Sequence, residues 1–228
     1  MQKVLIVETN VTRYGQTNDP TGLWLGEAAE FVDELQRANI EFDFVSPKGG
    51  FVPLDPRSMK YTDDEIMRIY ESQDFVTRGL TNTMTPAEVH TEDYAAIYYT
   101  GGHGVMWDFP NDQPLQKIAQ TIYQQGGYVT SVCHGIAGLL NLRDADGQYL
   151  IAGKKVTGFT TAEEIIAGKK SVVPFLNQQV ATSHGAVFQK KRFYKPYAIA
   201  DGQLITGQNP FSVRPVAKLL IAHLQEAS

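Results

Sequence analysis

The chain has 228 residues, enough for one sizeable α/β domain, and we expect a single domain over residues 1–228. Its formal net charge of −5, without a long basic run, argues against nucleic acid or an anionic membrane as main partner. The one cysteine excludes an internal disulfide, and the apolar run near the N-terminus is too short for a signal peptide or a membrane span, so we expect a cytoplasmic location.

The chain opens with the pattern of a parallel α/β protein. The unbroken apolar run Lys3–Val7 predicts a strand buried on both faces, followed by a polar loop at 9–22. Apolar residues at helical spacing predict a helix over 23–38, and Phe42–Val45 reads as the second strand. This order implies a right-handed crossover between parallel strands.

The next stretch continues the alternation. Residues 47–59 read as a loop, and 62–65 form a good helix start. Thr85, followed by a proline and then an acid at the third helical position, is typical of a helix cap. A strand is predicted over 94–100, and a helix over 114–125.

The centre of the chain holds the only cysteine. Tyr128–Val132 predicts a buried strand, and residues 136–140 continue as a helix. Cys133 therefore stands in a small–x–Cys–x–small pattern at a strand-to-helix turn, the spacing of a nucleophile elbow. The start of the helix should favour the thiolate. A lone cysteine can also be a small buried hydrophobe, but the flanking pattern and the adjacent His134 favour a reactive thiol.

The C-terminal part has a less regular pattern. Residues 155–158 predict a short strand, and a helix is expected from Glu164 to about residue 175. A basic, aromatic segment follows at 189–195. Residues 197–206 predict a hairpin around an Asp-Gly turn, and 212–224 a closing helix.

Three turns follow predicted strands and should meet at one edge of the sheet, where open parallel sheets bind ligands. They are the glycine-rich turn at 101–104, the elbow at 133–135 and the turn at 158–164. The glycine-rich turn is either a plain tight turn or, more in keeping with a nucleophile elbow, an oxyanion hole. The N–H groups of Gly102 and His134 are the candidate donors, and we assign Gly101 and His103 to substrate binding.

Acid–base chemistry needs a histidine and a partner carboxylate. His134, next to the thiol, is the candidate general acid and base, and either Glu163 or Glu164 would orient it. Glu27 lies in a mostly apolar helical stretch. It is either on a solvated edge of that helix or turned inward, where it could share a proton with Cys133.

Four motifs, G-G-H-G, S-V-C-H-G, K-V-T-G-F-T-T-A-E-E and G-x-N-P, resemble the ThiJ/PfpI superfamily. Within it the chain is most similar to the branch of heat-shock chaperones and glyoxalase III enzymes. The resemblance implies a flavodoxin-like, three-layer α/β sandwich with a mostly parallel sheet and helices on both faces. By position it implies that Cys133 is the nucleophile, His134 its base, Glu164 rather than Glu163 the triad acid, and Glu27 a hydrogen-bond partner of the cysteine.

The implied activity is that of a glutathione-independent glyoxalase. Methylglyoxal and related 2-oxoaldehydes would become 2-hydroxy acids through a hemithioacetal on Cys133, a lyase reaction of the D-lactate dehydratase type. The reaction needs no cofactor, and we expect no metal, because His103 lacks further ligands at metal spacing in the sequence. The superfamily also implies a homodimer.

Other functions stay open at this point. The same thiol could serve a stress chaperone, a protein deglycase or a redox sensor oxidised at the cysteine, or, less in keeping with the pattern, a cysteine peptidase or amidase. The chain also departs from many glyoxalase III members: it has K-R-F-Y-K-P-Y at 191–197, where they carry P-W-D-D followed by Phe or Tyr. This difference bears on the substrate range.

Overall fold

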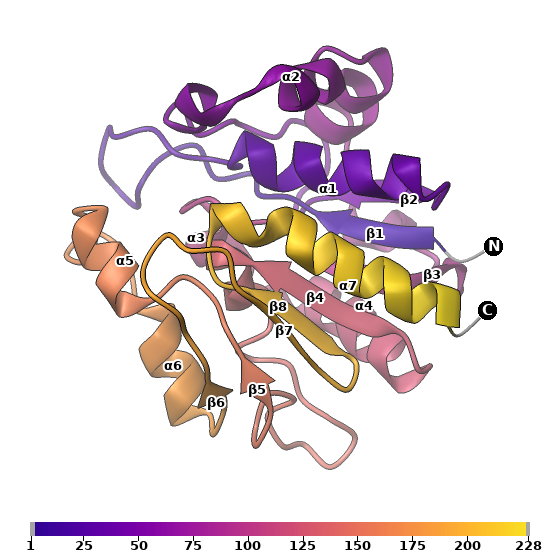
Figure 1. Ribbon diagram of the computed structural model, residues 1–228, viewed down its shortest axis with the longest axis vertical. Helices are drawn as coiled ribbons and strands as arrows, with labels where there is room; N and C mark the ends of the chain where they lie inside the picture. The colour runs from indigo at the N-terminus through magenta and orange to yellow at the C-terminus, as the bar shows by residue number, and fades with distance from the viewer. Residues whose placement is uncertain (1–2, 227–228) are drawn as a thin grey trace.

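The computed structural model describes residues 3–226 and is built around a six-stranded sheet with helices on both faces (Figure 1). The strand order is β2-β1-β3-β4-β8-β7, and every neighbouring pair is parallel except β7 with β8. The predicted three-layer, mostly parallel fold is confirmed. The strands of this sheet are β1 (Lys3–Val7), β2 (Phe42–Val45), β3 (Tyr94–Tyr99), β4 (Tyr128–Val132), β7 (Ala198–Asp201) and β8 (Leu204–Gly207).

Two hydrophobic cores sandwich the sheet. One lies under α1, α2 and α7, and the other under α3 and α4 (Figure 1). Alternate residues of β1 enter opposite cores, as expected for a strand buried on both faces: Ile6 packs in the first and Leu5 in the second. The α-helices are α1 (Leu25–Arg37), α2 (Asp64–Tyr70), α3 (Val105–Asp108), α4 (Gln113–Gln124), α5 (Thr161–Ile166), α6 (Asn177–Ser183) and α7 (Val213–Glu226).

Short helical turns connect several of these elements. The capped segment predicted at Thr85 is only a 3₁₀ turn, although its capping box forms. The 3₁₀ turns are η1 (Ser58–Tyr61), η3 (Pro86–Glu88), η4 (Thr91–Asp93), η5 (Cys133–Gly138) and η6 (Pro210–Ser212), and η2 (Phe75–Thr81) is a π-helical turn.

Two predicted helices differ from the structure. The helix expected from Glu164 starts earlier, at Thr161, because Thr160 and Glu163 form a reciprocal capping box, and it ends at Ile166. The helix expected at 136–140 is the 3₁₀ turn η5, whose backbone packs tightly under β3.

The strand predicted at 155–158 is also shorter than expected. Only β5 (Lys155–Val156) forms, and it pairs with β6 (Val187–Phe188) in a separate two-stranded sheet. The Thr157 N–H donates to the side chain of Thr206, so the segment lies beside β8 without joining its backbone ladder. Between residues 3 and 226, no helix has both the length and the apolar character needed to cross a bilayer.

Candidate active site

The elbow holds Cys133 in a backbone conformation that is rare for a residue with a side chain. Its φ is 57°, at the junction of β4 and η5. Gly135 makes the turn possible, because a Cβ there would stand 2.2 Å from the carbonyl oxygen of Tyr99. The thiol is nearly buried and reaches the wall of a cavity. This geometry is that of the predicted nucleophile elbow.

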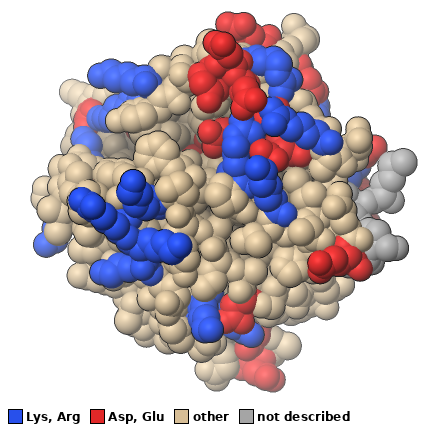
Figure 2. Space-filling view, viewed as in Figure 1, with Lys and Arg blue, Asp and Glu red and all other residues tan. Residues whose placement is uncertain are grey.

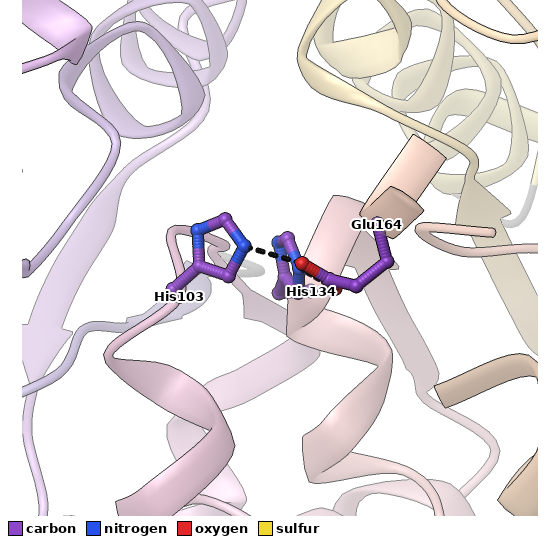
Figure 3. Close-up of side chains that lie close together, drawn as sticks. All are labelled: His103, His134 and Glu164. Carbon is purple, nitrogen blue, oxygen red and sulfur yellow. Dashed lines mark hydrogen bonds and ion pairs between the residues drawn. The ribbon is translucent and has the colours of Figure 1, made fainter. Parts of the chain in front are cut away.

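A chain of hydrogen bonds runs from the thiol to a carboxylate that two histidines share. Figure 3 shows the two histidines and the carboxylate. Cys133 Sγ lies 3.4 Å from His134 Nδ1, and His134 Nε2 lies 2.8 Å from Glu164 Oε2. The other oxygen, Oε1, is 2.7 Å from Nε2 of His103. The structure therefore places Glu164, and not Glu163, against His134.

The charge state of this group follows from its burial. Burial alone would raise the pKa of Glu164, but the charge of His134 and the hydrogen bonds from both histidines bring it far below its usual value. Burial lowers the pKa of His103 to about 4, and the neighbouring His134 acts in the same direction. Because an ionised carboxylate only accepts hydrogen bonds, we assign the ring proton of each histidine to Nε2. His134 Nδ1 is then the unprotonated nitrogen, facing the thiol.

Glu27 is turned inward, which resolves the alternative left open by the sequence. Its carboxyl is fully buried beside the thiol of Cys133 and the backbone N–H of Gly101. Neither oxygen makes a hydrogen bond of ordinary geometry with the described residues. Burial raises the pKa of Glu27 to about 8, so the carboxyl is mostly protonated at neutral pH.

The thiol itself is not held as a thiolate at rest. Burial raises the pKa of Cys133 well above its usual value, the adjacent Glu27 carboxyl acts in the same direction, and the backbone N–H of His134 opposes it. The N–H group at the start of η5 favours the thiolate, in the direction expected from the sequence, but desolvation of the buried sulfur outweighs it. The proton must leave when the sulfur attacks.

The glycine-rich turn after β3 faces the elbow. Gly102 has a φ of 100° and comes so close to the loop before α1 that a Cβ would stand 2.2 Å from the carbonyl oxygen of Gly22. Within residues 3–226 the Gly102 N–H has no hydrogen-bond partner. It is therefore free to donate to a bound oxygen, as the oxyanion-hole prediction requires.

A cavity of about 550 Å³ opens over these groups. Aromatic side chains form most of its apolar wall, and sequence periodicity could not identify them, because they come from loops and helix ends rather than from regular strands. We call it the Cys133 cavity, and its lining includes Tyr14, Trp24, Glu30, Arg57, Lys60, Tyr61, Gly102, His103, Cys133, His134, Phe159, Ile166, Lys169, Tyr194 and Phe211.

One side of the cavity is closed by the loop between β1 and α1. Asp19 on this loop accepts hydrogen bonds from Arg57 and Lys169. The Lys169 ammonium lies 4.3 Å from the centre of the buried Tyr14 ring, and the Arg57 guanidinium 5.2 Å. That ring packs against His103 at 5.1 Å between centroids. The ion pairs thus fix an aromatic support behind His103.

The opposite side is closed by residues 189–195, which we call the wall segment. Buried Glu163 holds it, accepting from the backbone N–H of Tyr194 at 2.9 Å and from the side chains of Gln208 at 3.0 Å and Asn209 at 2.9 Å. Figure 2 shows basic side chains gathered over this segment and the adjoining α5. The two adjacent glutamates therefore make different contacts: Glu164 accepts hydrogen bonds from the two histidines, and Glu163 accepts one from the backbone of the wall segment.

His103, His134 and Glu164 are also a possible metal cluster, since one ligand atom from each lies within 4.8 Å of the others. Both oxygens of Glu164 already accept from the histidines, so an ion would have to displace these bonds. The expectation of no metal and no cofactor stays a prediction.

Cys133 stands at a strained elbow beside a histidine and a carboxylate, at the carboxyl edge of a mostly parallel sheet. This arrangement is typical of the class of α/β proteins that use a thiol as nucleophile. A sequence model described as the DJ-1/PfpI family matches residues 25–222. The chain belongs to this family, which confirms the resemblance seen in its motifs.

Similar proteins agree in length and fold. The chain is 34% identical to Glyoxalase 3 of Candida albicans, over 97% of this chain and 98% of that protein. It is 36% identical to glutathione-independent glyoxalase HSP31 of Saccharomyces cerevisiae, over 86% of each. The crystal structure of Rapid Encystment Protein 24 kDa from Francisella tularensis superposes with a TM-score of 0.94 at 35% identity, covering 98% of this chain and 99% of that one.

Proposed function

We propose that the protein is a glutathione-independent glyoxalase that converts methylglyoxal and related 2-oxoaldehydes to 2-hydroxy acids. The observation that carries the proposal is the order of contacts in the Cys133 cavity: thiol, unprotonated His134 Nδ1, His134 Nε2, Glu164 carboxylate. The curated relatives are named as glyoxalases. The chemistry is lyase-type, and its reactive group is a protein thiol, so it requires no cofactor.

The first step is attack of the sulfur on the aldehyde carbon. His134 takes the thiol proton through Nδ1, and the imidazolium then gives it to the new alkoxide, leaving a neutral hemithioacetal on Cys133. The N–H groups of Gly102 and His134 stabilise the oxyanion while it exists. Glu164 keeps the His134 ring oriented and stabilises its charged form.

The second step moves a hydrogen between the two substrate carbons and turns the hemithioacetal into a thioester of the 2-hydroxy acid. Water then cleaves the thioester and restores the thiol. The protonated Glu27 carboxyl lies beside the sulfur and can donate to it as it leaves.

The test is lactate formation from methylglyoxal without glutathione. We expect Cys133→Ser to abolish it, and Glu164→Gln to lower kcat/KM at least 100-fold, because His134 loses its orienting acceptor. His184→Gln, a histidine outside the Cys133 cavity, is the control and should match wild type. A wild-type protein that makes no lactate, or an active Cys133→Ser variant, would contradict the proposal.

A chaperone function is the second candidate, and the mouth of the cavity favours it. Tyr61, Ile166 and Phe211 line the cavity and are 60%, 51% and 47% exposed, which is unusual for apolar side chains of this size. The Cys133→Ser variant separates the two activities. Suppression of the aggregation of an unfolding client by this variant would establish a chaperone function that does not depend on the thiol.

Three expectations concern the whole protein. We propose a homodimer, a cytoplasmic location, and a small-molecule substrate rather than nucleic acid or a membrane as partner. The first two rest on the family resemblance and the composition. The last also rests on the size of the Cys133 cavity, about 550 Å³, which suits a small molecule.

A further inference from the structure

His103 has a position that the steps above leave unused. It follows directly on Gly102, a proposed oxyanion donor, and its ring lies 4.0 Å from that of His134 between centroids. Both histidines line the Cys133 cavity, and both donate from Nε2 to the same carboxylate (Figure 3). The site thus contains two imidazoles in equivalent arrangements, and only one of them faces the sulfur.

The free nitrogen of His103 is an unprotonated base. Nε2 carries the proton that is donated to Glu164, which leaves a lone pair on Nδ1. Within residues 3–226, Nδ1 has no hydrogen-bond partner. The low pKa of His103 keeps the ring neutral at physiological pH. A buried imidazole with one nitrogen fixed and the other unpaired in a substrate cavity is equipped to accept a proton from a ligand.

The proposed reaction needs a base that faces the hydrogen of the aldehyde carbon, on a different side of the substrate from His134. The aldehyde carbon becomes tetrahedral in the hemithioacetal, so its hydroxyl and its hydrogen point in different directions. His134 is placed for the sulfur and the oxygen that it has just protonated. Glu27 is a poor alternative for the carbon-bound proton, because it does not line the cavity and is largely protonated at neutral pH.

We propose that His103 is a further catalytic residue, whose Nδ1 carries the proton from the aldehyde carbon of the Cys133 hemithioacetal to the neighbouring carbonyl carbon. This inference rests on the glyoxalase function proposed above. Nδ1 takes the proton, and the C–H electron pair forms a double bond between the two carbons while the ketone oxygen becomes an enediolate oxygen. The hydroxyl proton of the first carbon passes to that oxygen. The His103 imidazolium returns its proton to the second carbon, and the first becomes the thioester carbonyl.

The supports around His103 suit this task. Glu164 fixes one edge of the ring and can stabilise the imidazolium when it forms. Tyr14 packs against the ring at 5.1 Å between centroids and Phe159 at 6.1 Å, so two aromatic contacts restrict the ring in addition to its hydrogen bond with Glu164. A fixed ring keeps Nδ1 directed at one place in the cavity.

The test compares His103→Gln with wild type. A glutamine amide can replace the Nε2–H donor to Glu164 but has no basic nitrogen. The variant therefore keeps the hydrogen bond that His103 makes to Glu164 and removes its ability to accept a proton. Three quantities are measured: kcat for lactate formation, the kinetic isotope effect with methylglyoxal deuterated at the aldehyde carbon, and protection of Cys133 from iodoacetamide by methylglyoxal. Protection reports hemithioacetal formation. His223→Gln is the matched control, and His103→Asn replaces His103→Gln if the latter does not fold.

We expect His103→Gln to protect the thiol as wild type does, to lose about 100-fold or more in kcat, and to show a larger isotope effect. A kcat near the wild-type value would overturn the assignment and leave His103 as a support of Glu164. Loss of thiol protection would also overturn it, because His103 would then act in the first step. Absence of lactate with wild type would instead refute the glyoxalase function itself, and the assignment with it.

Discussion

At the scale of single residues, the pair of Glu27 and Cys133 explains how a buried thiol can react. Both groups are acids that burial makes weaker, so at neutral pH the fold stores two protons beside the reacting sulfur. In the proposed mechanism, the thiol proton passes to His134 when the sulfur attacks, and the Glu27 proton is available to the sulfur when it leaves. Burying these two acids lowers the free energy of unfolding, by an amount that depends on pH.

Glu27→Gln should change the pH dependence of stability. The pKa of Glu27 is raised from about 4.5 in the unfolded chain to about 8 in the folded protein. The protonated carboxyl therefore contributes fully to folding stability below pH 4.5, and this stability is lost as the pH rises through 8. The wild type should therefore lose roughly 4 kcal/mol relative to Glu27→Gln between these limits. Urea unfolding from pH 5 to 9 measures this. Parallel curves would contradict it, and the exposed Glu71→Gln is the control.

The sequence was sufficient to predict which side chains lie together at the candidate site, and insufficient to predict what surrounds them. Cys133 and His134 could be found because small residues flank them at a strand end, and Glu164 because the motif resemblance selects it over Glu163. The position of Tyr14 could not, because it depends on ion pairs between distant segments. Nothing in the spacing of His103 revealed that it shares a carboxylate with His134.

At the scale of elements, α5 shows how a short helix can serve two sides of a site. The capping box at Thr160 fixes where the helix begins, and this start turns Glu163 toward the wall segment and Glu164 toward the histidines. The sequence predicts this helix three residues too late, because the pattern at 160–163 is also typical of a turn. The wall segment could not be predicted, since it contains no regular element.

Glu163→Gln should loosen the wall without stopping the chemistry. Its Oε1 accepts three hydrogen bonds, and its Oε2 accepts from the N–H and the hydroxyl of Thr160. An amide nitrogen in either place would face a donor, at a cost of roughly 1–3 kcal/mol in stability. We expect KM to rise several-fold, more for phenylglyoxal than for methylglyoxal, with kcat little changed. Steady-state kinetics with both substrates measure this. Glu88→Gln, which alters an exposed capping box, is the matched control; an equal effect there would contradict the interpretation.

At the scale of the whole molecule, the central sheet joins the two cores. Neighbouring residues of β1 pack into opposite cores, so neither core can open without disturbing the same strands. The helices over the first core are further tied by buried Asp33, which pairs with Arg37, Arg68 and Arg214. Figure 2 shows the mixed acidic and basic side chains where α1, α2 and α7 meet. The chain order predicts this parallel sheet, because β–α–β units permit few other arrangements.

We therefore expect one cooperative unfolding transition, in keeping with a single domain over residues 1–228. Leu35→Ala in the first core and Leu115→Ala in the second should each lower the free energy of unfolding by about 2–5 kcal/mol. Each variant should therefore lower the midpoint temperature of the same single transition. Differential scanning calorimetry measures this. Two resolved transitions, each shifted by only one of the variants, would show that the cores belong to separate domains.

The tight packing of Gly135 under Tyr99 has a consequence for how proteins of this design diversify. Cys133 is anchored at the carboxyl end of the inner strand β4, where moving it would displace β3 and β4 together. Tyr61, Tyr194 and Phe211, by contrast, come from peripheral turns that contribute nothing to the sheet. Natural variation can therefore replace the cavity walls and change which aldehydes are accepted, while the covalent chemistry is inherited unchanged.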